Sequence, residues 1–490
     1  MRLQIVALVF CFLVSACSAE AQTSSPPSLV LHGSVHSTQN QTYIEAPFNV
    51  PEGTHRITVA FHNLGRDHHT VIDLGILDPF RFRGASGGNK EQFTLSETDA
   101  TPSYLPGAIP PGLWKLLLAI PNIRAGVTSG WSAEVWFDRP LDDSSFTEQT
   151  LRDRPYWYRG DVHMHTAHSD GSCPSQSGKS VPCPLFLTVE AAVRRGLDFI
   201  AITDHNTTSQ YDDERELQPY FDKLLMIPGR ELTTFNGHAN VFGTTRFLDY
   251  RVGTAQVPDD NSMFRKAREL GAIVSINHPE APTGEVCMGC GWTPTHPVDM
   301  TLVSSIEVVN GSHVASRFWD GQLRDGHRLT AVGGSDNHHA DWPPDRISSI
   351  GSPTTVIYAQ NLSVAGILAG IRSGRVFVDL TGSRNRLLDM NALAGSSSAA
   401  MGSDLQTHWG DAIALEVHVV GCEGASVHLL MDGKPQADLP LLPIGTSDAL
   451  LHAAWKSDGK RHYIRAEVRD AGDHLLLLGN PIYLGFTSEP

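Results

Sequence analysis

The chain has 490 residues, which is longer than one ordinary domain and predicts two to four domains. Its formal net charge is −16, because 53 acidic residues outnumber 37 basic ones. Nucleic-acid binding needs clustered Lys and Arg, and basic runs here reach only two residues, as at Arg194-Arg195, so the sequence argues against a nucleic-acid partner. The chain also holds 23 histidines, and metal ligation is one of several causes of such an excess.

The N-terminal segment, residues 1–21, is typical of an export signal. Arg2 supplies the positive charge, and residues 3–14 form an apolar core that is too short to span a membrane with normal flanks. Two processing sites compete: residues 14–17 (VSAC) resemble a bacterial lipobox that would leave Cys17 lipidated, and residues 19–21 (AEA) resemble an ordinary cleavage site. We favour the lipobox. The expected protein is bacterial and exported, either periplasmic or a lipoprotein that touches the membrane only through its anchor.

Five cysteines lie beyond this signal, and an exported protein can keep disulfides. Cys173 and Cys183 bracket a short polar segment, so that a bridge between them would staple a loop. Cys287 and Cys290 form a C-x-x-C motif, which is either a tight disulfide or half of a metal knuckle. A second C-x-x-C is missing from the sequence, which argues against a zinc knuckle. Cys422 is left over and is expected to be buried.

The pattern of apolar residues divides the chain into three domains. Residues 28–150 carry short alternating runs separated by Gly, Pro and Asn turns, which predicts a β-sandwich-like domain that is a scaffold or a binding module. Over residues 155–384 apolar β-runs alternate with helical stretches, which predicts a largely parallel, barrel-like α/β domain. Alternating runs return over residues 385–490 and predict a second, smaller β domain.

Three helices and seven strands stand out in the central domain. Each expected helix ends just before a glycine, a common helix terminator: residues 188–195, 262–270 and 364–373 precede Gly196, Gly271 and Gly374. The expected strands are residues 160–163, 199–203, 224–228, 239–242, 272–276, 305–309 and 330–332.

Residues that bind metals recur next to these strands, mostly just past their C-terminal ends. They are His163, His165, Asp170, His205, Glu231, His238, His278, Asp336 and His338. In a parallel barrel the C-terminal strand ends form one face, which carries the active site. Neutral imidazole and carboxylate ligands suit zinc, manganese or iron. Single His-x-His or Asp-His pairs occur by chance in a chain so rich in histidine, so the prediction of a metal site depends on the whole series.

These stretches resemble the polymerase and histidinol phosphatase (PHP) superfamily of metallohydrolases, and more narrowly its CehA/McbA branch. The matching sequences are GDVHMHT (160–166), GLDFIAITDHN (196–206), IPGRE (227–231), GH (237–238), INHP (276–279), IEVVN (306–310) and GGSDNH (333–338). The resemblance is strong over about residues 155–380, and DLG (73–75) and YLPG (104–107) look like the β-rich N-terminal region of that branch.

The resemblance implies a distorted seven-stranded (β/α) barrel that holds two or three divalent metal ions, flanked by the two β-sandwich-like domains. Carried over residue by residue, the ligands form three groups: His163, His165, Glu231 and Asp336; Glu231 as a bridge, with His238 and His278; and Asp170, His205 and His338. Several relatives have His at the position of Asp170. A carboxylate there would weaken the third site or favour a harder metal.

The implied activity is hydrolysis by a metal-activated water, which would cleave phosphoester or carbamate and ester bonds of a small molecule. The sequence has no Walker-type loop. Asp204 is a candidate to orient a ligand imidazole, with a turn cap as the alternative. His313 and His339 are candidates for the general acid, with bystander roles as the alternative.

Substrate charge should show in the residues beside the metals. A phosphoester would need cationic partners, for which the candidates are Arg317, Arg324 and Arg346. An uncharged carbamate would need an aromatic wall, for which the candidates are Trp292, Trp319 and Trp342. Glu307 and Asn310 end a strand that faces the site and are candidates to touch substrate.

The alternative function is a non-catalytic, metal-stabilised surface binding protein, since exported β domains often bind glycans or partners. The nearly complete set of ligands argues against it, because structural metal sites tend to be closed and few.

Overall fold

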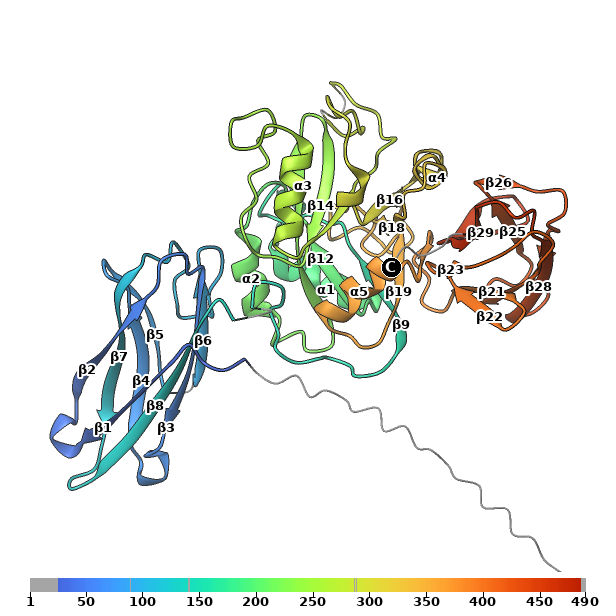
Figure 1. Cartoon of the computed structure of the whole chain (residues 1–490). Coiled ribbons are helices and arrows are strands. Elements are labelled where there is room, and N and C mark those ends of the chain that lie inside the picture. Colours follow the sequence, from blue (N-terminus) through green and yellow to red (C-terminus); the bar gives the residue numbers. More distant parts are fainter. Residues whose placement is uncertain (1–24, 89, 140–141, 286, 288, 486–490) are drawn as a thin grey trace, which may run out of the picture.

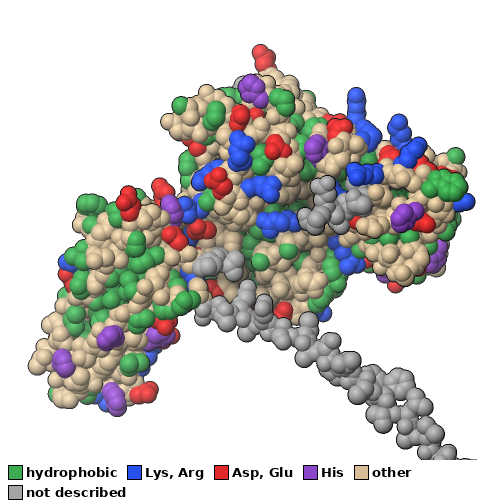
Figure 2. Space-filling model, in the orientation of Figure 1, with side chains coloured by type: hydrophobic (Ala, Val, Ile, Leu, Met, Phe, Trp, Pro, Cys, Tyr) green, Lys and Arg blue, Asp and Glu red, His purple; other side chains and the backbone are tan. Residues whose placement is uncertain are grey.

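The computed structural model describes residues 25–88, 90–139, 142–285, 287 and 289–485, which form three bodies along the chain. In Figure 1 the N-terminal body (blue) and the C-terminal body (red) lie on opposite sides of the central body. The expected export signal and Cys17 lie outside the described residues. None of the helices in the described ranges is long and apolar enough to cross a membrane. On the face seen in Figure 2, basic and acidic side chains are interspersed over the central body.

The N-terminal body consists of two four-stranded antiparallel sheets that share one apolar core. The first sheet has the order β1 (Leu29–His36), β8 (Thr128–Phe137), β3 (Arg56–Asn63), β6 (Gln92–Ser96), and the second has the order β2 (Thr42–Val50), β7 (Gly112–Asn122), β4 (Val71–Leu77), β5 (Phe82–Ser86). Along β7, the alternate residues Leu116, Leu118 and Ile120 are buried. This alternation is the pattern of a strand with one face on a core.

The central body contains β9 (Tyr156–Asp161), β10 (Ser172–Pro174), β11 (Ser180–Pro182), β12 (Phe199–Ile202), β13 (Leu225–Thr234), β14 (Gly237–Phe242), β15 (Ile273–Ile276), β16 (Ser305–Asn310), β17 (His313–Val314), β18 (Thr330–Gly334), β19 (Thr354–Ala359) and β20 (Val376–Asp379). Neighbouring strands are parallel in β9–β12–β13 and in β15–β16–β18. However, β14 is antiparallel to β13 and β15, and β19 is antiparallel to β9. The sheet is therefore less parallel than expected, because a link of only two residues joins β13 to β14 and permits only a hairpin.

Within the described part of the central body, five α-helices accompany these strands: α1 (Leu185–Arg195), α2 (Gln210–Leu217), α3 (Asp260–Glu269), α4 (Ser316–Arg324) and α5 (Val364–Ser373). The three expected helices correspond to α1, α3 and α5. Gly196 and Gly374 end α1 and α5 in the left-handed conformation, with φ of 73° and 71°. The short helices α2 and α4 were not expected. The sequence of α2, QYDDEREL, is mostly polar and carries too weak an apolar period to indicate a helix.

The C-terminal body contains β21 (Leu387–Ala394), β22 (Ser397–Ala400), β23 (Asp404–Leu405), β24 (Ala412–Val420), β25 (Ser426–Met431), β26 (Lys434–Pro435), β27 (Leu442–Pro443), β28 (Asp448–Lys456), β29 (His462–Arg469), β30 (Leu475–Gly479) and β31 (Ile482–Leu484). Four of them form a separate sheet, β22-β21-β24-β28, while β30 pairs with β20 of the central body. The hydrogen-bonded closed sheet thus includes C-terminal strands, and the seven-stranded barrel stays a prediction.

One C-terminal side chain completes the hydrogen bonding of the central strands. The amide oxygen of Asn480 accepts from the N–H of Ala331 at 2.7 Å, and its amide nitrogen donates to the carbonyl oxygens of Ala331 and Val376, both at 2.9 Å. Asn480 is buried. Because buried backbone groups need partners, this amide ties the C-terminal body to β18 and to the start of β20.

A buried ion cluster joins the N-terminal body to α2. Asp99 is fully buried and accepts from Arg56, with N···O distances of 2.5 and 2.9 Å, and from Arg215 of α2. Arg56 also donates to Thr245 of the central body at 3.0 Å. Burial alone would raise the pKa of Asp99, but Arg215 and Arg56 lower it well below 3.8. The cluster therefore stabilises the contact between the two bodies while Asp99 is ionised.

The substitution Asp99→Asn is expected to lower the free energy of unfolding by about 3 kcal/mol, because the buried Arg56 loses one of its two carboxylate partners and the partly buried Arg215 loses this carboxylate. Because the pKa is lowered in the folded state, this stabilisation is present above the ordinary pKa of 3.8 and is lost progressively as the pH falls from 3.8 towards the lowered pKa. Urea denaturation at pH 7 and at pH 3 measures both effects. The control is Glu45→Gln, which breaks an exposed pair with Lys115 and should cost at most about 1 kcal/mol. Equal losses in both variants would contradict the prediction.

Candidate metal centre

All nine predicted ligands meet in the central body, in three groups that share members. The first group is His163, His165 and Asp336; the second is His163, Glu231 and His278; the third is His165, Asp170, His205 and His338. Within each group the ligand atoms lie within 4.8 Å of one another. His238 joins the second group, since its Nδ1 lies 3.2 Å from Oε1 of Glu231. Because the groups share His163 and His165, the three candidate sites form one continuous cluster.

The first group depends on the ends of β9 and β18. His163 lies two residues beyond β9, and Asp336 lies two residues beyond β18. Oδ1 of Asp336 is 3.3 Å from Nε2 of His163 and 3.0 Å from Nε2 of His165. A side chain at Gly334 would collide with the carboxylate of Glu307 and with Cβ of His163. The glycine pair before Asp336 therefore allows the two strand ends to approach each other.

The second group lies along the β13–β14 hairpin, which corrects two of the expected positions. Glu231 lies inside β13 rather than after it, and His238 lies within β14 rather than before it. The longer strands follow from the tight hairpin, whose ladder pairs Thr233 with His238. Oε1 of Glu231 lies 3.4 Å from Nε2 of His163 and 3.5 Å from Nε2 of His278. Glu231 is thus close to members of both the first and the second group.

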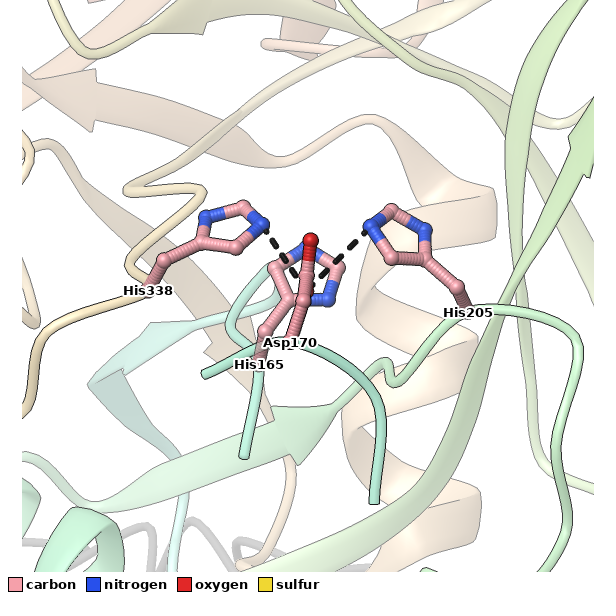
Figure 3. A group of neighbouring side chains, drawn as sticks. All are labelled: His165, Asp170, His205 and His338. Atoms are coloured by element: carbon pink, nitrogen blue, oxygen red, sulfur yellow. Dashed lines mark ion pairs between the residues drawn. The ribbon is translucent and has the colours of Figure 1, made fainter. Parts of the chain in front are cut away.

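The third group is the more open one, and Figure 3 shows Asp170 between two imidazoles. Oδ1 of Asp170 is 3.2 Å from Nε2 of His338 and 3.6 Å from Nε2 of His205. Its side chain is 59% exposed, whereas that of Glu231 is 1% exposed. The third group therefore lies at the mouth of the cluster and Glu231 at its base.

Three buried imidazole nitrogens in the cluster have no hydrogen-bond partner: Nε2 of His163, Nδ1 of His165 and Nε2 of His238. A buried polar atom without a partner costs about 1–3 kcal/mol. The three nitrogens lie in one set of His, Asp and Glu residues, and divalent cations would give them a partner. Imidazole and carboxylate together suit zinc, manganese and iron.

The charges of the cluster stabilise one another across the shared residues. Burial by itself would lower the pKa of His163, but the carboxylates of Glu307, Asp336 and Glu231 raise it well above 6.5. Burial would raise the pKa of Glu231, but His163 and its other imidazole neighbours lower it well below 4.5. Protons on imidazoles such as that of His163 would therefore balance the carboxylates whenever no cation is bound. Divalent cations would replace those protons, because metal binding requires neutral imidazole.

Glu307 supports two ligands without being one of the predicted nine. Its carboxylate accepts from Nδ1 of His163 at 2.8 Å, from the backbone N–H of His278 at 3.0 Å and from the amide of Asn310 at 3.0 Å. Only 2% of Glu307 is exposed. A carboxylate on the far nitrogen of a ligand imidazole fixes its tautomer and its orientation. The sequence indicated Glu307 as a residue facing the site, and the structure adds this contact with His163.

Of the two roles expected for Asp204, the contacts favour the turn cap over the orientation of an imidazole. Its carboxylate accepts from the N–H and hydroxyl of Thr166, both at 2.7 Å, and from the hydroxyl of Ser169 at 2.5 Å. The side chain therefore orders the loop between His165 and Asp170 rather than an imidazole. This follows from the position of Asp204 at the end of β12, where the neighbouring loop offers three donors.

The two general-acid candidates lie in different surroundings. His313 is exposed and lines a pocket of about 150 Å³ beside His278 and Glu307. His339 lies on the rim next to the third group, where its Nδ1 is 2.9 Å from the hydroxyl of Ser172 and its ring stacks on Trp342 at 4.7 Å. The pocket thus brings His313 close to the second group, while His339 is held by its own neighbours.

The charge of this pocket bears on the substrate. Its lining includes the carboxylates of Glu280 and Glu307, the imidazole of His313 and apolar groups of Val314 and Ala315. The described residues that line it include no Lys or Arg. An anionic group entering this pocket would therefore find no guanidinium or ammonium partner there.

Comparisons with known proteins yield several likenesses, two of which are the following. The chain is 27% identical, over 157 residues, to an uncharacterized protein of Methanocaldococcus jannaschii, a match that covers 32% of this chain and 83% of that protein. It also resembles a two-domain protein of Bacteroides vulgatus, described as containing a predicted PHP-like metal-dependent phosphoesterase. That likeness has 20% identity and a TM-score of 0.38, and it covers 67% of this chain and 96% of the other. At this TM-score we draw no conclusion about this chain from it. No family model matches the chain.

Proposed function

We propose that this chain is a metal-dependent hydrolase of PHP type that acts on a small molecule. The observation that carries the proposal is the cluster itself. It combines three overlapping groups of His, Asp and Glu ligand atoms with buried imidazole nitrogens that have no hydrogen-bond partner. Such a site fits two or three divalent ions, of zinc, manganese or iron. When bound, ions of this kind supply an acidified water and stabilise charge on the attacked group.

Residues at different positions in the cluster would have different roles. Glu231, at the base, would bridge between the first and second groups, because its carboxylate lies 3.4 Å from His163 and 3.5 Å from His278. Asp170, at the open side, would complete the third group and leave access from solvent. His313 would donate a proton to a leaving group in the adjoining pocket, where it is within reach of solvent.

The pocket favours an uncharged carbamate or ester over a phosphoester as substrate, in keeping with the resemblance to the CehA/McbA branch. However, an aromatic wall for a carbamate would not be formed by all three of the expected tryptophans. Trp319 is fully buried and donates to the carbonyl oxygen of Leu329 at 2.8 Å, so it belongs to the core. Trp342 stacks on His339 at the rim. The cationic candidates Arg317 and Arg346 are exposed. A phosphoester remains the alternative substrate, as in the wider superfamily.

Export to an oxidising compartment is part of the proposal, with no nucleic-acid partner and with the membrane reached only through an N-terminal lipid. Two disulfides support it: Cys173–Cys183, which staples the β10–β11 hairpin, and Cys287–Cys290. The Cys287–Cys290 bridge supports a disulfide, rather than half of a metal knuckle, as the role of the C-x-x-C motif.

The proposed function predicts about two or three metal ions in the purified protein, measured by mass spectrometry after reloading with zinc or manganese. It also predicts turnover of a naphthyl carbamate above that of a nitrophenyl phosphate. In the variant His163→Ala, which removes a ligand common to two groups, the metal content should fall and turnover should drop by more than about 100-fold. A chelator should abolish turnover of the wild type, and added metal should restore it.

The matched control is His452→Ala, which removes an exposed histidine of the C-terminal body whose side chain is 61% exposed. It should keep both metal and turnover. Fewer than about one ion per chain in reloaded wild-type protein would contradict the ligand assignment and favour the binding-protein alternative. Faster turnover of the phosphate would identify the substrate as a phosphoester.

A further inference from the structure

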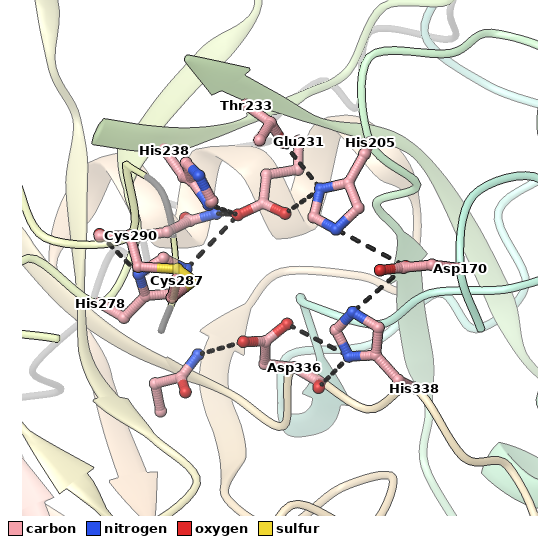
Figure 4. Close-up of a disulfide and its surroundings, with 12 residues drawn as sticks. Asp170, His205, Glu231, Thr233, His238, His278, Cys287, Cys290, Asp336 and His338 are labelled. Carbon is pink, nitrogen blue, oxygen red and sulfur yellow. Dashed lines mark hydrogen bonds and ion pairs between the residues drawn. A yellow bond between two sulfur atoms is a disulfide. The ribbon is translucent and has the colours of Figure 1, made fainter. Parts of the chain in front are cut away.

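A disulfide-closed loop contacts the ligand His278. Figure 4 shows the Cys287–Cys290 bridge beside the His278 side chain, on the side away from Asp170. Nδ1 of His278 lies 3.1 Å from the carbonyl oxygen of Cys290, while Nε2 lies 3.5 Å from Oε1 of Glu231. The imidazole therefore connects the loop on one side with the cluster on the other.

The carbonyl oxygen of Cys290 determines the tautomer of His278. A carbonyl can only accept a hydrogen bond, so Nδ1 must carry the proton and donate it. In the neutral ring the lone pair is then on Nε2, the nitrogen that points to Glu231. This is the arrangement in which outer partners orient a metal-binding imidazole. The backbone N–H of His278 also donates to Glu307 at 3.0 Å. The ring packs against those of His163 and His238, and its Nδ1 is held by Cys290.

The loop is also packed against the hairpin that carries His238. A side chain at Gly289 would collide with the carbonyl oxygen of Thr234, and one at Gly237 would collide with the ring of Trp292. The N–H of Trp292 donates to the carbonyl oxygen of Pro279 at 3.0 Å. Residues 289–292 therefore pack between His278 and the turn before His238. Their conformation bears on two ligands of the second group.

We propose that the Cys287–Cys290 disulfide positions His278 for metal binding, so that retention of the ion of the second group depends on the bridge being oxidised. The proposal rests on the proposed function, since it assumes that the second group holds a metal. The bridge limits the conformations of the loop and keeps the Cys290 carbonyl on Nδ1. Without it, the imidazole would sample orientations that turn Nε2 away from Glu231.

Reduction is the chemical step that releases the loop. A dithiol reductant transfers two electrons and two protons to the bridge; the S–S bond breaks, two thiols form, and the reductant becomes a cyclic disulfide. Cys287 is partly exposed and Cys290 is buried, so Cys287 is the side from which a reductant would approach. The Cys173–Cys183 bridge closes the hairpin beside Asp170 and serves as an internal comparison on the third group.

The test measures manganese binding by equilibrium dialysis of the whole protein, with metal counted by mass spectrometry. Manganese is used because new thiols would themselves bind zinc. In the double variant Cys287→Ser/Cys290→Ser, the affinity for one ion should fall by about tenfold while the other ions are unchanged. Oxidised wild type treated with the dithiol should lose affinity for the same ion. The variant Cys422→Ser, which replaces a buried free cysteine of the C-terminal body, should match the wild type.

A positioning role predicts a second signature in turnover. At saturating manganese the double serine variant should regain the wild-type turnover number and KM, and half-activation should require about tenfold more manganese. Cys173→Ser/Cys183→Ser should leave the ion of the second group in place. Wild-type affinity for every ion in the double serine variant would overturn this proposal and leave the hydrolase standing. Absence of metal in the oxidised wild type would overturn both.

Discussion

Replacing Glu231 with glutamine is expected to abolish hydrolysis while leaving the chain folded. The carboxylate is 1% exposed and lies at the base of the cluster, 3.4 Å from Nε2 of His163, 3.2 Å from Nδ1 of His238 and 3.5 Å from Nε2 of His278. Glutamine has the same shape but no charge, so it cannot bridge two cations. Loss of a residue that only orients a metal-binding side chain lowers activity by up to about 100-fold. Because Glu231 would bind metal itself, we expect a larger fall in turnover and the loss of at least one ion.

Metal content and turnover of Glu231→Gln are measured beside those of Glu214→Gln. Glu214 is also fully buried in the central body but is not part of the three groups. Burial raises the pKa of Glu214 well above 4.5, so glutamine resembles the neutral acid already present there. This control should keep its metal and its turnover. Full metal content and turnover in Glu231→Gln would exclude Glu231 as the bridging ligand.

The second large effect is expected for the substitution Glu307→Gln. Glu307 itself need not touch a metal. Its carboxylate receives hydrogen bonds from Nδ1 of His163 and from the backbone of His278. A glutamine oxygen can keep one of these bonds, while its NH₂ group cannot accept the other. We expect metal affinity to fall about 10–100-fold, the range for outer-shell partners of metal-binding histidines.

Turnover at high metal concentration distinguishes a positioning role of Glu307 from a substrate-binding role. Because the ligands themselves remain, the Glu307→Gln variant should regain most of its turnover at high metal concentration, with KM for the carbamate unchanged. A variant that binds metal normally but shows a raised KM would instead indicate contact with substrate through the adjoining pocket. Metal titrations at several carbamate concentrations measure both quantities, again with Glu214→Gln as the control.

The sequence predicted the nine candidate ligands that the structure brings together, because most of them lie next to strands that are recognisable by local pattern. His163, His278 and Asp336 each follow a short apolar run, and the glycines before Asp336 indicate a close approach of the backbone. The helices that end at Gly196 and Gly374 were predictable for the same reason, since a helix terminator is a local signal. Neither inference required knowledge of which strands pair.

Features that depend on pairing between distant segments were not predictable. The antiparallel course of β14 follows from a hairpin that places His238 opposite Thr233, and the sequence pattern alone placed His238 outside the strand. The contact of Asp204 with Thr166 and the buried pair of Asp99 with Arg215 join residues far apart in the chain. A single sequence contains no signal for such contacts, because the presence of an Asp does not reveal whether the partner of its carboxylate is an imidazole, a hydroxyl or a guanidinium.

The amide of Asn480 makes the last hundred residues part of the frame around the metal centre. A chain cut after residue 384 would leave the Phe377–Asp379 edge of β20 without its partner β30, and the N–H of Ala331 without an acceptor. Unpaired edges of this kind promote aggregation. Ala331 lies on β18, the strand that leads to Asp336. The C-terminal body therefore could not be exchanged freely by recombination. The central body and its final β strands would have to be inherited, and produced in the laboratory, as one unit.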